Sequence, residues 1–208
     1  MTTAPITIEP MQAKYNSQIG RLLVLGFRGK FQNLTKMNDG DLALFFEKLL
    51  AYFPSEPASQ RMVALQEGEV IGTISIKWKP ESDIMRNREL LSWKNLKILR
   101  KWSLLKMLFG LSLLDYKPQA RECYIADIAV HPNHRSKGVG KRLLQWAQHF
   151  VQAEPHLEVL TLHVVGNNPR AKQLYELLSF QTHMQKESFV RRLLFNESKL
   201  DYMVLKTK

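Results

Sequence analysis

Two glycines and several basic residues, placed between a strand-like segment and a helix-like segment, could bind a phosphate. Residues 135–141 read R-S-K-G-V-G-K and open an amphipathic stretch. Gly138 and Gly140 lack a Cβ, so an anion can come close to the main chain there. Amides at a helix start have unsatisfied N–H groups and lie at the positive end of the helix dipole, which predicts a pyrophosphate site. Basic side chains add positive charge around this turn: Arg135, Lys137 and Lys141.

Other chemistries are disfavoured by what the sequence lacks. The glycine spacing matches neither the Walker A pattern nor the dinucleotide fingerprint, which disfavours ATP and NAD sites. Cys123 is the only cysteine, so an internal disulfide and a cysteine metal cluster are excluded. No group of His, Asp and Glu residues has metal-ligand spacing, and we expect no metal.

The elements that must position this turn follow an α/β pattern, read from strand-like alternation and from helical spacing of apolar residues. The residues Glu67-Gly68 are a hairpin signal between two strands. The predicted strands cover residues 6–9, 62–66, 70–78, 122–130, 157–165, 180–184 and 200–206. The predicted helices cover residues 12–27, 39–52, 138–153 and 168–178. This order predicts one domain over residues 1–208, with a mixed sheet and helices on both faces.

A helical insertion is predicted at residues 84–117, before the fourth strand. Apolar residues recur there at helical spacing, lysines fall on another face, and Gly110 is expected to kink or divide the helix. We favour a helical hairpin packed over the sheet edge. A lid over the acceptor site, or a docking face for an anionic partner, is the alternative. Peripheral membrane contact by residues 84–114 is a less favoured interpretation.

The formal net charge of +11 favours acidic partners, such as a polyphosphate cofactor, nucleic acid or an anionic membrane. No RNA-binding aromatic motif or helix-turn-helix pattern supports a specific nucleic-acid partner. The sequence shows no signal-peptide pattern and no uninterrupted apolar run of about 18 residues, so a cytoplasmic location is expected. The oligomeric state is left open.

Two motifs resemble those of the GCN5-related N-acetyltransferase (GNAT) family. Residues 129–140 contain A-V-H-P followed by R-S-K-G-V-G, which match the family's Val-His-Pro strand end and its R-x-x-G-x-G turn. Residues 168–175 match its N-x-x-A-x-x-x-Y pattern, although Ser179 replaces the usual glycine before Phe180. The resemblance is strong over residues 121–184. It implies the GNAT acyl-CoA N-acyltransferase fold.

The resemblance also implies that acetyl-CoA is bound as cosubstrate. In such proteins the strand corresponding to residues 124–130 parts from the one corresponding to residues 157–165, and pantetheine lies between them. Asn168 would hydrogen-bond the pantetheine arm, or cap the helix that begins at Pro169, or do both. The residues implied to bind the cofactor are Ile128, Ala129, Val130, Arg135, Ser136, Lys137, Gly138, Val139, Gly140, Lys141, Asn168 and Tyr175.

The implied reaction is direct transfer of an acetyl group to a primary amine within a ternary complex. Tyr175 lies where the family places the acid that protonates the coenzyme A sulfur; its alternative role is that of a core aromatic residue. Asp127 lies in an apolar strand, where an unpaired carboxylate is costly. It is predicted to be the general base, to bind a cationic acceptor, or to pair with a basic side chain. Strict alternation predicts that it faces away from Tyr124, Ala126 and Ile128.

Several interpretations stay open. His163 in the next predicted strand could relay a proton, although most such histidines are only hydrogen-bonded. A main-chain N–H near Val130 would meet the oxyanion. A non-catalytic acyl-CoA sensor or interaction module is the alternative function. Polyamines, antibiotics, amino acids, peptide N-termini and lysine side chains all remain candidate acceptors.

Overall fold

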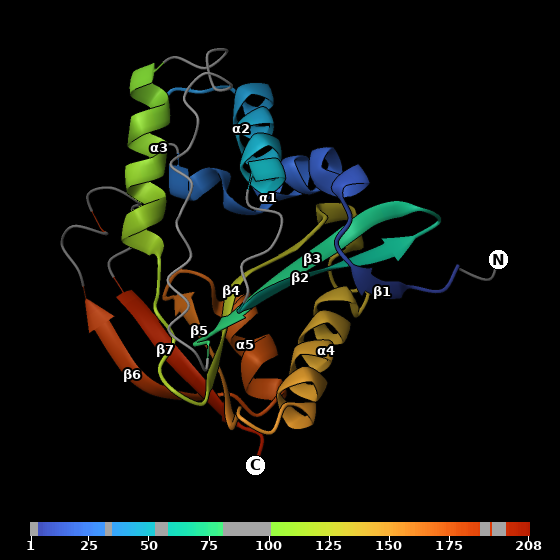
Figure 1. Ribbon diagram of the computed structural model, residues 1–208, viewed down its shortest axis with the longest axis vertical. Helices are drawn as coiled ribbons and strands as arrows, with labels where there is room; N and C mark the ends of the chain where they lie inside the picture. Colours follow the sequence, from blue (N-terminus) through green and yellow to red (C-terminus); the bar gives the residue numbers. More distant parts are fainter. Residues whose placement is uncertain (1–3, 32–34, 53–57, 81–100, 188–191, 193–198) are drawn as a thin grey trace.

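The computed structural model describes residues 4–31, 35–52, 58–80, 101–187, 192 and 199–208, and every statement about structure concerns these residues. The strands are β1 (Thr7–Pro10), β2 (Ser59–Gln66), β3 (Glu69–Trp78), β4 (Glu122–Val130), β5 (Val159–Val165), β6 (Gln181–Glu187) and β7 (Lys199–Lys206). The helices are α1 (Asn16–Phe31), α2 (Asp39–Tyr52), α3 (Lys101–Leu114), α4 (Val139–Ala153) and α5 (Pro169–Leu177), with short 3-10 turns at Ala13–Tyr15 and Pro132–His134. The strands form one mixed sheet in the order β1-β2-β3-β4-β5-β7-β6 (Figure 1). The α/β mixed fold is therefore as predicted.

The first four strands form an antiparallel meander. Glu67 and Gly68 join β2 to β3 with φ values of 53° and 81°, which suits the two left-handed positions of a tight hairpin turn. The sequence predicts that Pro10 follows the first strand, but it is the last residue of β1 and pairs with Met62. An edge strand tolerates this proline because its missing N–H does not interrupt a central ladder.

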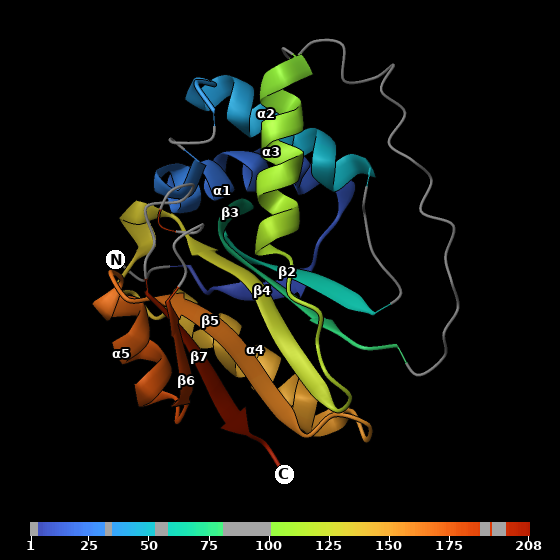
Figure 2. The ribbon, with the colours of Figure 1, turned by 90° about the vertical axis from the view of Figure 1, so that its left-hand side faces the viewer.

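Two groups of helices cover opposite faces of the sheet (Figure 2), and an apolar core lies under each group. Helices α1, α2 and α3 cover the first core, which contains the fully buried Ile19 and Leu42. Helices α4 and α5 cover the second, which contains Leu143 and Leu160. Helix α1 ends later than the predicted 12–27 because Phe31 still packs into the first core. The amphipathic helices thus pack on the sheet through the apolar faces that the sequence pattern predicts.

Helix α3 lies between β3 and β4 in the chain and runs through Gly110 without division, so the prediction of a divided helix is wrong. Met107 of this helix is fully buried against α1 and α2, and these packing contacts carry the helix past the glycine. Phe109, on another face of α3, is 58% exposed. Residues 84–100 of the predicted insertion lie outside the described residues. The lid, docking and membrane interpretations stay predictions.

Strand β4 contains one bulge that changes which way its side chains face. Asp127 pairs with Ser75 and Ile125 with Ile76, so the intervening Ala126 has no partner on β3. Ile125 and Ile128 both belong to the core under α4, although they are three residues apart. Asp127 and Tyr124 consequently face the same side, that of α1, so the prediction that they face opposite sides is wrong, whereas Ile128 faces away from Asp127 as predicted. The extra residue of the bulge shifts the two-residue period by one.

Candidate functional site

Strands β4 and β5 pair at one end and part at the other. Their parallel ladder runs only from Glu122 opposite Val159 to Ile125 opposite Leu162. Beyond it, β4 stays paired with β3 and β5 with β7, so the two strands diverge. The bulge at Ala126 directly follows the last shared pair, and a bulge bends the strand that carries it. The sheet is opened along this one seam.

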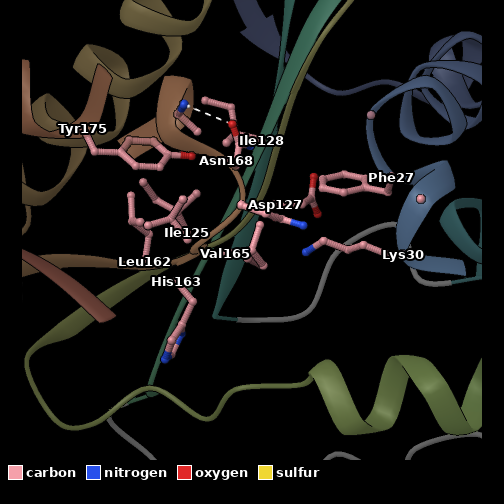
Figure 3. Close-up of a pocket in the computed structure, with 16 residues that line it drawn as sticks. Phe27, Lys30, Ile125, Asp127, Ile128, Leu162, His163, Val165, Asn168 and Tyr175 are labelled. Carbon is pink, nitrogen blue, oxygen red and sulfur yellow. Dashed lines mark hydrogen bonds between the residues drawn. The ribbon is translucent and has the colours of Figure 1, made fainter. Parts of the chain in front are cut away.

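A cavity of about 450 Å³ occupies the opening (Figure 3). Its two long walls are residues 125–128 of β4 and 162–165 of β5. Asn168 and Tyr175 line it from the side of α5, and Phe27 and Lys30 line it from α1. Its size fits the narrow arm of a small ligand together with a second small group.

The part of β4 beside the opening presents main chain to it. Ile128, Ala129 and Val130 pair with β3 along one edge, and β5 no longer covers the other. Arg135 Nε donates to the Val130 carbonyl at 3.2 Å, so that carbonyl is engaged. The structure places these residues where a ligand could add to the free edge of β4, in the manner of an extra strand.

The predicted phosphate turn is an open cluster of amides at the start of α4. Gly138 has φ 81° and is the residue before the first helical position. Within the described part of the chain, the amides of residues 136–141 donate to no main-chain acceptor, and the first bond of the helix runs from Arg142 N to the Gly138 oxygen at 3.0 Å. Nothing lies within 4 Å of the point where a Cβ on Gly138 would stand. Arg135, Lys137 and Lys141 are exposed around the turn, as an anion site requires.

Gly140 has a different role from Gly138. A Cβ added at Gly140 would stand 3.3 Å from Leu174 of α5 and 3.7 Å from Val130 of β4. Gly138 faces open space, whereas Gly140 also allows α4 to pack closely; the binding of an anion at the two glycines stays a prediction. Val139 beside it is buried and anchors the first turn of the helix.

Sequence reasoning missed Arg170. Its guanidinium donates to the Ser136 hydroxyl and so connects the start of α5 with the turn before α4. Ser136 has a left-handed φ of 62°, which is uncommon for a residue with a side chain. A cation in the first turn of a helix is unfavourable because the helix dipole is positive there. The position of Arg170 at a helix start was therefore the signal in the sequence that could have identified it. An anion bound between the starts of α4 and α5 would offset the repulsion between this cation and the helix dipole.

Asn168 caps α5 with one atom of its amide. Its Oδ1 accepts from the Ala171 N–H at 3.2 Å, drawn as the dashed line in Figure 3. The predicted capping role is present. The Nδ2 group is a separate donor that the cap does not use. The two predicted roles are therefore compatible.

Tyr175 is buried in the second core, and its hydroxyl points into the cavity toward Ile128 and Asn168 (Figure 3). Its ring packs against Phe180, with 5.9 Å between centroids. Burial raises the pKa of the Tyr175 phenol to about 12. The group therefore holds its proton at neutral pH and can act only as a donor there.

Asp127 is held by an arginine two strands away. Its two carboxylate oxygens accept from Arg61 Nη1 and Nη2 at 2.7 and 2.6 Å. Both side chains are mostly buried, at 22% and 14% exposed. This bidentate pair corresponds to the structural alternative for Asp127, because both oxygens are engaged and the charge is matched. The catalytic assignment of Asp127 stays a prediction.

His163 lies where a group that transfers protons would have to be, although the sequence pattern gave it only as a secondary candidate. It lines the cavity, and its Nδ1 lies 3.1 Å from the Tyr124 hydroxyl. The rings of Tyr116 and Tyr202 each lie 5.1 Å from the imidazole, and both tyrosines donate to the buried carboxylate of Glu122. Burial raises the pKa of both phenols. The imidazole is thus an oriented group with polar partners behind it.

The described residues contain neither a group of side chains suited to a metal ion nor a helix suited to cross a membrane. Among them, no three His, Cys, Asp or Glu side chains lie close enough to hold a metal ion. None of the described helices has the length and apolar character needed to cross a membrane.

Solved structures with the same fold include several acetyltransferases. A putative acetyltransferase of the GNAT family from Desulfovibrio desulfuricans aligns with TM-score 0.62 and 12% identity, over 98% of this chain and 100% of that one. A chimera of the spermidine N-acetyltransferase SpeG from Vibrio cholerae and hSSAT gives 0.61 and 17%, over 97% and 95%. Arabidopsis thaliana NAA60 in complex with a bisubstrate analogue gives 0.59 and 18%, over 97% and 98%. At these identities the likeness shows the fold alone.

Sequence comparison identifies the family of the chain but no individual relative. No curated protein sequence matches the chain. The family model described as "Acetyltransferase (GNAT) family" matches residues 34–180, which include the parted strands, the phosphate turn and Tyr175. The chain belongs to the GNAT family of acetyltransferases.

Proposed function

We propose that the protein is an N-acetyltransferase that uses acetyl-CoA to acetylate a primary amine by direct transfer in a ternary complex. Three observations carry the proposal: a cavity between parted strands, a protonated phenol that lines it, and an open amide cluster at the start of α4, which Arg170 connects to α5 through Ser136. GNAT membership supports the reaction class.

The residues at the turn fit the donor. The amides of residues 136–141 and the open space above Gly138 suit its pyrophosphate, and Arg170 adds a further cation from α5. The Asn168 Nδ2 and the free edge of β4 suit the amide groups of the pantetheine arm. Bound acetyl-CoA supplies the activated acetyl thioester. The protein must then supply the proton transfers and stabilise the developing negative charge.

Two side chains would handle the protons. Tyr175 donates its phenolic proton to the departing thiolate, which suits a group that is protonated and faces the cavity. His163, oriented by Tyr124, accepts the proton that the amine loses. A main-chain N–H near Val130 stabilises the negative charge that develops on the acetyl oxygen. We favour His163 over Asp127 as base because Arg61 occupies both Asp127 oxygens.

The test is a panel of amines assayed by thiol release from acetyl-CoA, with donor binding measured by calorimetry. We expect thiol release with at least one amine class, and a fall in kcat of about 100-fold for His163→Ala with an unchanged donor affinity. His183→Ala is the matched control, because His183 lies on β6 and does not line the cavity. Donor binding without turnover on any amine would favour the acyl-CoA sensor, and the absence of donor binding would remove the proposal.

A further inference from the structure

The described residues that line the cavity offer no unmatched carboxylate to a cationic acceptor. Asp127 is the one acidic side chain among the described residues that line it. That carboxylate is already neutralised by Arg61 through two short parallel bonds. Lys30 lines the same cavity from α1. An ammonium group entering here would lose solvent without gaining an unmatched carboxylate.

Among the described residues that line the cavity, the group proposed to take the proton is the His163 imidazole. The groups that face His163 include Tyr116, Tyr124 and Tyr202, with the exposed His183 and the buried Glu122 beyond Tyr202. Imidazole has an ordinary pKa of about 6.5, far below that of an alkyl ammonium. It can accept a proton from an amine that is attacking, but it is a poor base for a strongly basic ammonium.

Amines differ widely in how much of their neutral form they supply. An α-amino group has a pKa of about 8, so roughly a tenth of it is neutral at pH 7. A lysine amine has a pKa of about 10.4, so about one in 2,500 molecules is neutral at that pH. Without a carboxylate to bind the ammonium and then deprotonate it, this difference of roughly 250-fold passes directly into the rate.

We infer that the acceptor is a weakly basic primary amine, above all the α-amino group of a peptide or amino acid, and that polyamines and lysine side chains are poor acceptors. The inference rests on the proposed N-acetyltransferase function and names its substrate class. The Asp127–Arg61 pair is what separates this site from one that recognises a polycation. The fold shared with a spermidine acetyltransferase does not bear on this difference, because a fold does not fix the acceptor.

Two matched peptides of one sequence test the inference. One carries a free α-amine and an acetylated lysine, and the other an acetylated α-amine and a free lysine; spermidine is the third substrate. At pH 7 we expect kcat/KM by thiol release to favour the free α-amine by at least about 100-fold. The ratio should shrink about tenfold by pH 9, because the α-amine is by then mostly neutral while the lysine is not. Equal or higher kcat/KM on the lysine peptide or on spermidine would overturn the acceptor class while leaving acetyl transfer intact.

A variant tests the cause. Arg61→Gln frees the Asp127 carboxylate, so kcat/KM for spermidine relative to the α-amine peptide should rise by about tenfold or more. Arg61→Lys keeps a cation beside Asp127 and should retain the original preference. Donor affinity by calorimetry and far-ultraviolet dichroism confirm that each variant is folded. An unchanged preference in folded Arg61→Gln would contradict the inference. If the wild-type chain bound acetyl-CoA but acetylated no amine, the proposed function would fail, and the acceptor class with it.

Discussion

Asn168 shows at the scale of one residue how a helix cap and a ligand can share an amide. Its Oδ1 accepts a hydrogen bond from the Ala171 N–H, and its Nδ2 is proposed to donate to acetyl-CoA. Aspartate is an equally good cap but carries no donor, whereas alanine provides neither function. The two substitutions therefore separate structure from binding.

We expect Asn168→Ala to lose about 1 kcal/mol of unfolding free energy and to weaken acetyl-CoA binding. Asn168→Asp should keep the stability but weaken binding at least as much, because a carboxylate replaces the donor and repels phosphate. Urea unfolding and calorimetry measure the two effects. Full donor affinity in Asn168→Asp would show that Nδ2 does not touch the donor.

Removal of one oxygen from Tyr175 should affect the chemical step more than binding. In Tyr175→Phe we expect kcat to fall about 100-fold while KM for acetyl-CoA changes little, since the phenol is proposed to act as an acid. Because its pKa is raised to about 12, Tyr175 stays protonated through the alkaline range, and wild-type activity should show no loss from its ionisation below about pH 11. A turnover number that is unaffected in Tyr175→Phe would exclude it as the essential acid.

At the scale of the element, the start of α4 depends on one left-handed residue with open space above it. Gly138 has φ 81°, and no atom lies within 4 Å of the place that a Cβ would take there. Gly68, in the hairpin between β2 and β3, has the same φ of 81° and the same open surroundings, but it does not stand at the start of a helix. The chain thus contains its own control for backbone strain.

Gly138→Val and Gly68→Val should each cost about 1–2 kcal/mol of unfolding free energy, because a side chain strains the left-handed conformation. Gly138→Val alone should weaken acetyl-CoA binding, by about 100-fold if two charge-assisted bonds are lost. Thermal unfolding and calorimetry on both variants check this. Equal donor affinity in the two variants would count against the phosphate turn.

The same elements show what the sequence could and could not predict. The turn at residues 135–140, the strand at 122–130 and the helix at 39–52 are local patterns, so their positions were predictable. Arg61 with Asp127, and Arg170 with Ser136, are pairs far apart in the chain, and no periodicity reports them. The bulge at Ala126 was also hidden, since the residue types of β4 do not show which residue lacks a partner on β3.

At the scale of the whole molecule, the charge of +11 should act on the donor through its phosphates. We expect acetyl-CoA affinity to fall steadily as salt rises from about 0.05 to 0.5 M, because the Debye length shortens from roughly 14 to 4 Å. Acetyl-pantetheine, which lacks the nucleotide phosphates, is the control and should show little salt dependence. The same slope for both compounds would mean that the basic residues at the turn do not contact phosphate.

Ala126, the residue of β4 that has no partner on β3, also determines what a deletion in this strand would do. Deleting Ala126 would restore an uninterrupted two-residue alternation in which Asp127 and Ala129 still face α1, and we expect it to let β4 and β5 continue their ladder past Ile125. The product would be a more regular sheet with nowhere to put a thioester. In this chain an irregularity of one residue stands where the ladder between β4 and β5 ends and the cavity begins.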